Sequence, residues 1–324
     1  KRGGMVQASC RHAVANNKFT NQNTTSGQNS ASKSNYLMYL DANNLYGWAM
    51  SQPLPHKELE WFEGFTEEMA RNYDPNNEYG YFVECDLENP TELHDAHNDY
   101  PLGPTRECVK ADKLSPYCQK LYTEVYEVSK VPDEKVEKLL LTLKDKERYT
   151  VHVHLLRFYL EQGLVLKKVH RVVRFKQSAW LEPYVRFNTE KRKVSTSDFQ
   201  KDFFKLMNNA PYGKTMEDVK NHVDYELINN VDRYEKVVAK PSYKRTSVIK
   251  NDLVVVEKDK EKIYLNKPIP IGVAILDLSS LHMYDFFYNT LKPKFGQNLQ
   301  LLYTDTDSFV STLKPLTFTK SLLT

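Results

Sequence analysis

Two apolar runs that end in aspartate restrict the fold of this chain more than any other feature. Residues 36–40 (YLMYL) lead into Asp41, and residues 301–303 (LLY) lead into Asp305 and Asp307. A carboxylate that follows a buried strand is costly unless it is solvated, paired or bound to a metal ion. Side chains two apart in a strand point the same way, so the Asp305 and Asp307 carboxylates are expected about 7 Å apart or closer.

If the two runs are neighbouring strands, the three aspartates form an oxygen-rich cluster of the kind that holds Mg²⁺ together with substrate phosphates and water. Two such ions, about 3.5–4 Å apart, can stabilise both the attacking and the leaving oxygen of a phosphoryl transfer. Each acidic segment alone is a weak signal, because a single aspartate at a strand end is usually a turn or cap residue. Other segments must therefore decide between the two interpretations.

The segment 197–213 is the best-defined helix of the sequence. Ser197 followed by Gln200 is a capping-box start, and Pro211 and Gly213 mark the end. At about 100° per residue the helix has an apolar face and a polar face, made respectively by Phe199, Phe203 and Leu206 and by Lys201, Lys205 and Asn209. We expect it to bury its aromatic side chains and to present the lysines outward, where they can neutralise phosphate oxygens. A solvated helix face is the plainer interpretation of the same lysines.

Basic residues are concentrated in this part of the chain. The net charge of the whole sequence is only +3, but residues 165–214 contain twelve Lys/Arg and four Asp/Glu, a net charge of +8. Such a stretch is expected to bind a polyanion or, equally, to form a solvated basic face.

Composition excludes several classes of protein. The 324 residues are 40% hydrophobic and 27% charged, and no apolar run approaches the roughly 20 residues of a membrane span. The first residues, KRGGMVQASC, lack the apolar core of a signal peptide. The cysteines have neither CxxC nor CxH spacing, so we expect reduced thiols at Cys10, Cys85, Cys108 and Cys118. We therefore expect an intracellular protein that is not secreted and has no membrane partner.

The remaining segments predict an α+β chain. Strands are expected at residues 81–85, within 221–262, and on both sides of a helix in 149–176. Further helices are expected at 134–142 and 269–293, and a polar loop at 20–35. A histidine-containing, Pro-flanked loop offers no further metal ligand, so we interpret its polar residues as structural: His94, Asp95, His97 and Asp99.

Three segments carry a resemblance to the family B DNA polymerases. Residues 41–47 (DANNLYG) resemble motif A, D-x-x-S-L-Y-P, and residues 205–213 (KLMNNAPYG) resemble motif B, K-x-x-x-N-S-x-Y-G. Residues 303–308 (YTDTDS) match motif C, Y-x-D-T-D-S, at every position, and the three segments follow the family's order. The departures are Asn44 for Ser, Gly47 for Pro and Ala210 for Ser.

The surrounding sequence resembles the protein-primed branch of this family, in particular the polymerases of Polinton/Maverick-type mobile elements and their viral relatives. The similar stretches include DANNLYGWAMSQPLP, LHDAHNDYPL and FQKDFFKLMNNAPYGKTME, and the likeness covers most of residues 3–312. It implies an α+β fold with a polymerase palm (an antiparallel sheet backed by helices), helical fingers and two insertion subdomains.

By position, the resemblance divides the chain into five parts: 1–55, first part of the palm with motif A; 56–176, an insertion resembling the first terminal-protein region; 177–220, fingers with motif B; 221–262, an insertion resembling the second terminal-protein region; and 263–324, second part of the palm with motif C. A thumb and an exonuclease domain are not expected in this chain. Gly3-Gly4 would be what remains of a Y-x-G-G linker, and Asp86-Leu87-Glu88 follows motif A, whereas the family's exonuclease precedes it.

The resemblance also implies roles for individual residues. Asp41 and Asp307 would be the principal ligands of two Mg²⁺ ions, with Mn²⁺ as an alternative metal. Asp305 would be an accessory ligand, and the Ala42 carbonyl would complete one shell. Tyr46 would exclude a ribonucleotide 2′-hydroxyl. The other nucleotide-binding residues would be Leu45, Lys205, Asn209, Tyr212, Gly213, Lys201, Arg192 and Lys193.

The implied activity is template-directed addition of dNTPs to a primer 3′-hydroxyl by two-metal phosphoryl transfer. Its partners would be a DNA template-primer, a dNTP and a terminal priming protein, in the replication of a mobile element or virus, in the nucleus or at a viral replication site. The alternative is a truncated, catalytically incompetent remnant that only binds nucleic acid, because neither an exonuclease domain nor a thumb is expected within this sequence. Nucleotide incorporation and nucleic-acid binding, measured on the same chain, separate these hypotheses.

Overall fold

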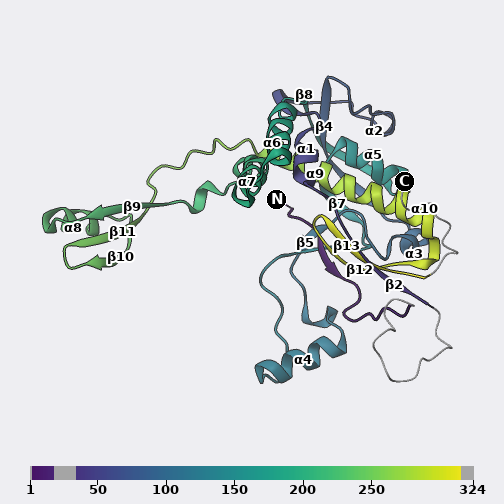
Figure 1. The fold of residues 1–324 in the computed structure, drawn as a ribbon, viewed down its shortest axis with the longest axis horizontal. Helices are drawn as coiled ribbons and strands as arrows, with labels where there is room; N and C mark the ends of the chain where they lie inside the picture. The colour runs from purple at the N-terminus through teal and green to yellow at the C-terminus, as the bar shows by residue number, and fades with distance from the viewer. Residues whose placement is uncertain (1, 18–33, 315–324) are drawn as a thin grey trace. The chain divides into compact units, whose positions relative to one another are not determined.

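The computed structural model of the chain describes residues 2–17 and 34–314. It is a mixed α+β protein with antiparallel sheets (Figure 1), which confirms the α+β part of the fold class expected from the sequence. The chain divides into two compact units, Lys1–Asn209 with Val273–Thr324, and Ala210–Gly272. The polar loop expected at residues 20–35 lies almost entirely outside the described residues.

The first unit contains a four-stranded antiparallel sheet with the order β1-β12-β13-β2. Its strands are β1 (Val6–Ala8), β12 (Leu299–Asp305), β13 (Ser308–Leu313) and β2 (Tyr36–Asp41). The two apolar runs that end in aspartate are therefore strands of one sheet, separated by β13. Ser308 pairs with Asp41 on one side and with Asp305 on the other, so these three residues form one row across the strand ends.

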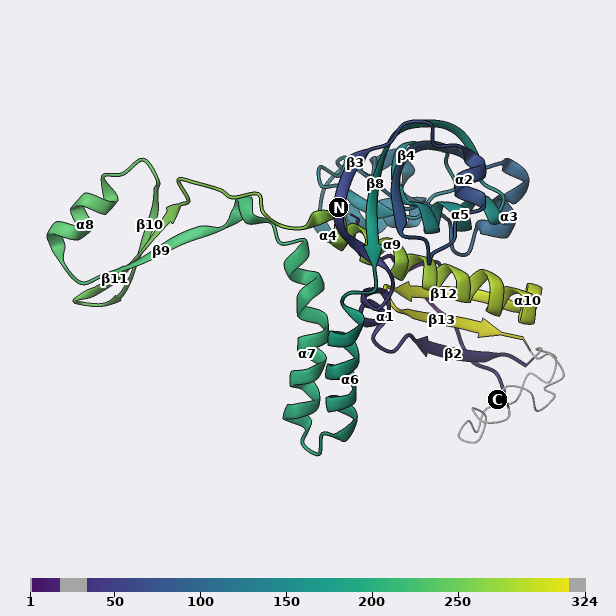
Figure 2. The ribbon, with the colours of Figure 1, turned by 90° about the horizontal axis from the view of Figure 1, so that it is seen from above.

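A long helical segment covers one face of this sheet, the face opposite the side chains of Asp41, Asp305 and Ser308 (Figure 2). It consists of α9 (Ile269–Asp285), a π-helical stretch (Phe286–Leu291) and α10 (Lys292–Phe295), and it ends at Gly296, whose φ of 53° suits glycine. Phe309 of β13 alternates with the residues of the aspartate face and packs against Phe287, with ring centroids 5.8 Å apart. The helix expected at residues 269–293 is confirmed.

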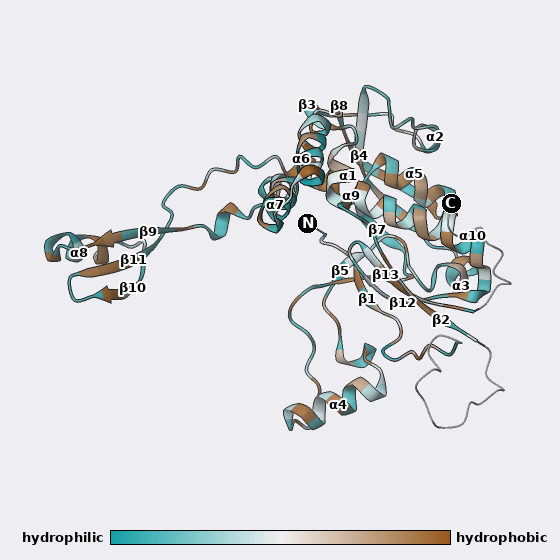
Figure 3. Ribbon diagram, in the orientation of Figure 1, coloured by the Kyte–Doolittle hydropathy of each residue, from teal (hydrophilic) through white to brown (hydrophobic). Residues whose placement is uncertain are grey.

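A second four-stranded antiparallel sheet, with the order β3-β8-β4-β7, lies in the same unit. Its strands are β3 (Leu54–Trp61), β8 (Val165–Ser178), β4 (Tyr79–Glu88) and β7 (Lys146–His152). Helix α5 (Val153–Glu161) connects β7 toward β8 and packs on α9, with the Tyr159 and Tyr284 rings 5.9 Å apart. Figure 3 shows hydrophobic residues along both helices. The strand, helix and strand expected within residues 149–176 are confirmed.

The helix expected at residues 134–142 is wrong. The structure has a short strand there, β6 (Lys138–Leu140), which pairs with β5 (Thr105–Glu107). A nine-residue helix is marginal on its own, because the cost of nucleation is spread over few hydrogen bonds. Pairing with a distant strand therefore decided this segment. Short helices of the unit include α1 (Leu45–Met50), α2 (Glu67–Arg71), α3 (His94–His97) and α4 (Pro116–Tyr126).

Helices α6 (Glu182–Val194) and α7 (Asp198–Thr215) lie side by side as a hairpin (Figure 2). The expected start of α7 is confirmed, since the Ser197 hydroxyl accepts a hydrogen bond from the Gln200 N–H at 3.3 Å. The expected burial of its apolar face is wrong. The side chains of Phe199, Phe203 and Leu206 are 78%, 46% and 64% exposed.

The contacts between the two helices explain this error. Helix α7 meets α6 through buried Asn208, whose Nδ2 donates to the Thr189 hydroxyl at 3.2 Å. The Tyr184 hydroxyl donates to the Met207 carbonyl at 2.9 Å. That carbonyl lacks its usual helical donor, because Pro211, four residues later, has no N–H. Amphipathic spacing identifies an apolar face but not its neighbour, and the neighbour of α7 contacts a different face.

The second unit contains a three-stranded antiparallel sheet with the order β10-β11-β9. Its elements are β9 (Val223–Ile228), α8 (Val231–Val238), β10 (Tyr243–Lys250) and β11 (Leu253–Asp259). Helix α8 packs on the sheet through a small core of Ile228, Val237 and Val256. The strands expected within residues 221–262 are confirmed.

Candidate active site

Asp41 and Asp307 come together at the ends of two neighbouring strands. The turn between β12 and β13 places Asp307 beside the end of β2, where the Ala42 N–H donates to the Asp307 carbonyl at 2.7 Å. The Asp307 N–H donates to the Asp305 carbonyl at 2.6 Å, which closes the turn. Asp41 and Asp307, far apart in the sequence, therefore meet where β2 ends and β13 begins, as the two apolar runs predict.

The electrostatics of Asp307 show which charges surround it. Partial burial raises the pKa of its carboxyl, and the neighbouring carboxylates of Asp41 and Asp305 raise it further. The hydrogen bond from its own backbone N–H and the positive charge of Lys205 act in the opposite direction. The positive charge of Lys205 on α7 is therefore close enough to act on the Asp307 carboxyl, as expected for a residue that would bind phosphate at this site.

Asp305 lies at the end of β12, and its carboxylate has partners within its own strand and turn. Its carboxylate accepts hydrogen bonds from the Tyr303 and Thr306 hydroxyls, both at 3.2 Å. Within the described residues, no group of three or more His, Cys, Asp or Glu side chains is arranged to hold a metal ion. The structure therefore brings Asp41 and Asp307 together as a pair and does not gather all three carboxylates into one ligand set.

This pair fits the donor chemistry of Mg²⁺. Magnesium is commonly bound through one or two carboxylates, and the rest of its shell is supplied by water and substrate phosphates. Burial raises the pKa of Asp307 and the negative charge of Asp41 raises it further, and a bound cation would counteract both effects by favouring the ionised carboxylate.

Tyr39 is a neighbour of this site that the sequence analysis missed. Its hydroxyl donates to Asp41 Oδ2 at 3.0 Å, and this bond raises the pKa of the tyrosine. Tyr39 and Asp41 lie two apart on β2, as Tyr303 and Asp305 do on β12. Period-2 spacing puts each tyrosine on the face of its aspartate, so the repeated Tyr-x-Asp pattern was the signal that could have found it.

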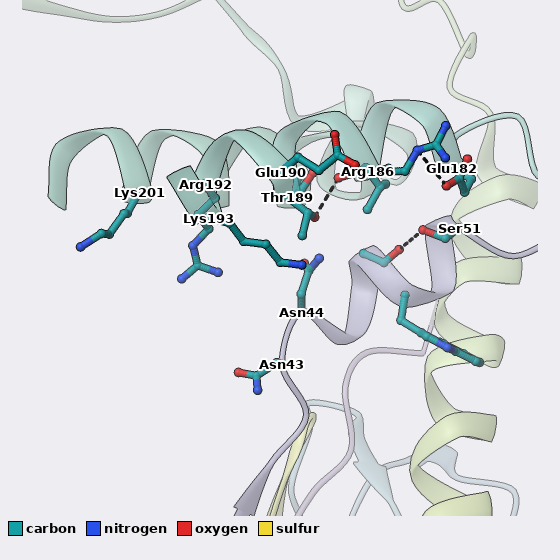
Figure 4. A pocket seen from close by; sticks show the side chains of 14 residues that line it. Asn43, Asn44, Ser51, Glu182, Arg186, Thr189, Glu190, Arg192, Lys193 and Lys201 are labelled. Atoms are coloured by element: carbon teal, nitrogen blue, oxygen red, sulfur yellow. Dashed lines mark hydrogen bonds and ion pairs between the residues drawn. The ribbon is translucent and has the colours of Figure 1, made fainter. Parts of the chain in front are cut away.

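A pocket of about 750 Å³ lies between the hairpin and helix α1 (Leu45–Met50). Arg192, Lys193 and Lys201 line it, and Figure 4 shows Arg192 and Lys193 extending from the hairpin toward the side of Asn43 and Asn44, whereas Lys201 points away from them. Asn44 has a left-handed backbone (φ 57°), and its carboxamide covers Gly47 so closely that an added Cβ would lie 2.6 Å from Oδ1. Three of the predicted nucleotide-binding residues therefore line one basic pocket.

The other predicted nucleotide-binding residues do not line this pocket. Leu45 and Tyr46 form the first turn of α1, where Leu45 is buried and Tyr46 half-buried. Asn209 is exposed near the end of the part of α7 that belongs to the first unit. Tyr212 and Gly213 belong to the second unit and are not placed relative to the carboxylates.

The polar groups that the sequence analysis declined as sites have structural partners. Asp86 accepts hydrogen bonds from the Arg148 N–H at 2.7 Å and interacts with His170 Nε2 at 2.8 Å. His97 is buried, and His94 Nε2 lies 3.1 Å from the Asn89 carbonyl. All four cysteines are free thiols. Across residues 2–17 and 34–314, no helix has the length and apolarity to cross a membrane.

Comparisons with known proteins give a structural likeness only. No protein-family model matches the chain, and no curated protein matches it. Solved structures that resemble it include three of Phi29 DNA polymerase: an orthorhombic crystal form, a binary complex with primer-template DNA, and a ternary complex with primer-template DNA and incoming nucleotide substrates. Their sequence identities are 15%, 14% and 16%, with TM-scores of 0.48, 0.47 and 0.47. Each comparison covers 98% of this chain but 42% of the other, so the chain spans about two fifths of their length.

Proposed function

We propose that this chain is the palm and fingers part of a DNA-directed DNA polymerase that adds dNTPs to a primer 3′-hydroxyl on a template. The observation that carries the proposal is the pair of Asp41 and Asp307 at neighbouring strand ends, with Lys205 in electrostatic reach. The order of the three sequence motifs supports it, because it assigns these same residues to one site.

Asp41 and Asp307 would hold divalent cations, with the Ala42 carbonyl completing the shell and Asp305 as an accessory ligand. When bound, Mg²⁺ or Mn²⁺ supplies the positive charge that phosphoryl transfer needs at the attacking and leaving oxygens. The tyrosine hydroxyl on Asp41 Oδ2 would fix the orientation of that carboxylate. The strand pairing on both sides of Ser308 would keep the two strand ends in register.

The hairpin would bind the triphosphate of the incoming nucleotide. Lys205 would neutralise phosphate charge next to the carboxylates, while Lys201, Arg192 and Lys193 would do so from the pocket. Leu45 and Tyr46 would contact the sugar, with Tyr46 as the gate against a 2′-hydroxyl. The motif B resemblance also assigns nucleotide binding to Asn209, Tyr212 and Gly213.

The sequence resemblance supports a narrower proposal about how the polymerase is primed and what it replicates. The polymerase would be protein-primed and would replicate a mobile element or virus inside the cell, using a terminal priming protein together with the DNA template-primer. The segments 56–176 and 221–262 would be the two insertions of that branch.

The test is Asp307→Asn in the full chain, assayed for Mg²⁺-dependent extension of a labelled primer. Loss of one charge that stabilises the reacting groups should lower incorporation on the order of 10³-fold. Duplex binding, followed by fluorescence anisotropy, should stay close to wild type. Asp252→Asn is the matched control, since this exposed aspartate lies in the turn between β10 and β11.

Unchanged incorporation by Asp307→Asn would refute the assignment of the site. If the wild-type chain binds primer-template DNA but never incorporates a nucleotide, the alternative hypothesis of a nucleic-acid-binding remnant is correct instead.

A further inference from the structure

The residues before β1 contact the turn that carries Asp305 and Asp307. Gly4 lies against Thr306, and a Cβ added at Gly4 would sit 2.9 Å from Thr306 Cβ and closer still to Oγ1 and Cγ2. The atoms in the way belong to a short side chain next to the backbone, which has little room to rotate aside. Any side chain at position 4 must therefore displace either this segment or the turn.

The turn is itself under conformational strain. Thr306 has a φ of 55°, in the left-handed region that β-branched residues rarely adopt. Its N–H donates to the Met5 carbonyl at 2.8 Å, and its hydroxyl contacts the Asp305 carboxylate. Because Thr306 does not favour this conformation, neighbouring groups must hold it there.

Residues 2–8, here termed the N-terminal strap, are anchored on both sides of Gly4. Arg2 forms an ion pair with buried Asp277 at 3.5 Å, donates to the Thr150 carbonyl, and places its guanidinium over the Tyr149 ring at 4.0 Å. Beyond Gly4, the strap continues into β1, whose Val6 pairs with Asp305.

Met5 fixes the strap to the helical layer behind the sheet. Its side chain is 3% exposed, and its Sδ accepts a hydrogen bond from the Tyr284 hydroxyl at 3.1 Å. Met5 therefore links α9 to the turn, because its side chain contacts Tyr284 and its carbonyl accepts a hydrogen bond from the Thr306 N–H.

We propose that the N-terminal strap positions the catalytic turn. Gly4 and the Met5 carbonyl hold Thr306 in its left-handed conformation, and this conformation sets where the Asp305 and Asp307 carboxylates point. Gly4 and Met5 are positioning residues, because they touch the turn and not the reacting groups. The catalytic part of this inference rests on the proposed function, whereas the coupling between Gly4 and Thr306 does not.

The experiment uses four variants of the full chain: Gly4→Ala, Thr306→Gly, the double variant, and Gly3→Ala as control. Gly3 is a matched control because an added Cβ there meets nothing within 4 Å. Gly4→Ala should lower kcat for primer extension by about 10- to 100-fold with little change in the KM for dNTP, because it misplaces carboxylates without removing a substrate contact. Gly3→Ala should behave as wild type.

Thr306→Gly supplies the decisive comparison. It removes the side chain that Gly4→Ala meets and tolerates the left-handed backbone. In this background Gly4→Ala should cost nothing further, in kcat or in the thermal midpoint. A loss of kcat in Gly4→Ala that Thr306→Gly does not rescue would show that Gly4 acts elsewhere, and equal behaviour of Gly4→Ala and Gly3→Ala would overturn the proposal.

Thermal unfolding separates failure of this inference from failure of the proposed function. If the wild-type chain incorporates no nucleotide, the four midpoints still report whether positions 4 and 306 are coupled. Should Gly4→Ala alone fail to fold, recovery of a cooperative transition in the double variant supports the coupling, and its absence contradicts it.

Discussion

Strand β8 and the α6–α7 hairpin follow one another in sequence and are both rich in basic residues, yet their charges are arranged differently. On β8, four basic side chains contact carboxylates of the neighbouring strand segments: Lys167 with Glu88, Arg171 with Glu84, Arg174 with Glu60, and Lys176 with Glu58 and Glu78. On the hairpin, Arg186 and Lys201 pair only with an acid of their own helix. Lys191, Arg192, Lys193 and Lys205 have no carboxylate within 4 Å in the described part of the chain.

This difference shows that a count of basic residues does not measure the charge available to a ligand. Most of the positive charge of β8 is neutralised by neighbouring segments, because four of its five Lys and Arg side chains form an ion pair with an acid there. The hairpin keeps cations that face the pocket and the carboxylate pair. A polyanion site within residues 165–214 remains a proposal. If it exists, the hairpin is the better candidate, because most cations of β8 already pair with acids.

The largest effect that distinguishes the two regions is expected at Lys205. Replacing it with alanine should raise the KM for dNTP about 10- to 100-fold, the equivalent of losing a hydrogen bond or contact to a charged group. Steady-state primer extension over a range of dNTP concentrations measures it. Lys167→Ala on β8 is the matched control and should leave this KM unchanged, because Lys167 already pairs with Glu88 at 2.7 Å. Loss of DNA binding without a change in KM would contradict the role of Lys205.

A smaller effect is expected from the double variant Arg192→Ala/Lys193→Ala. These cations line the pocket, and unlike Lys205 they are not among the charges that shift the pKa of Asp307, so their removal should weaken inhibition by inorganic tripolyphosphate roughly tenfold at low salt. The difference should shrink as salt rises, since screening reduces interactions between exposed charges. The corresponding pair on β8, Lys167→Ala/Arg171→Ala, should leave the inhibition constant at its wild-type value. Equal weakening by both pairs would show that β8 also binds the anion.

The sequence predicted this site better where the signal was local than where it depended on tertiary contact. That Asp41 and Asp307 lie together could be predicted, because apolar runs that end in aspartate are readable without a structure. The exposed Phe199 was misplaced because helical periodicity does not identify the partner of a face. The contact between Gly4 and Thr306 joins opposite ends of the chain, so no local pattern indicates it. Tyr39 could have been found, because its spacing from Asp41 repeats that of Tyr303 from Asp305.

The two regions should also differ in what their cations contribute to stability. Arg171→Ala leaves the buried Glu84 carboxylate with Arg148 as its remaining ionic partner, at 3.0 Å. The thermal midpoint should fall by a few degrees. Arg192→Ala, on the exposed hairpin, should leave the midpoint within error, because no acid depends on it. Differential scanning calorimetry compares the two, and a lower midpoint for Arg192→Ala alone would reverse the comparison.

The smallest expected effect is a pH dependence confined to β8. The hydrogen bond from Arg171 Nε, at 2.6 Å, lowers the pKa of Glu84, and the charge of Arg148 acts in the same direction. A carboxyl whose pKa is lowered by folding stabilises the protein above its ordinary pKa of about 4.3, and this stabilisation is lost as the pH falls through the lowered value. The difference in free energy of unfolding between wild type and Glu84→Gln should therefore be largest near neutral pH and shrink in acid. Denaturant titrations at several pH values measure it.

In an Arg171→Ala background the same substitution should have a smaller effect at neutral pH, because the main cause of the pKa shift is gone. A difference that grows on acidification would mean that Glu84 is destabilised by its surroundings, and that the charges of β8 are not neutralised in the way its salt bridges indicate.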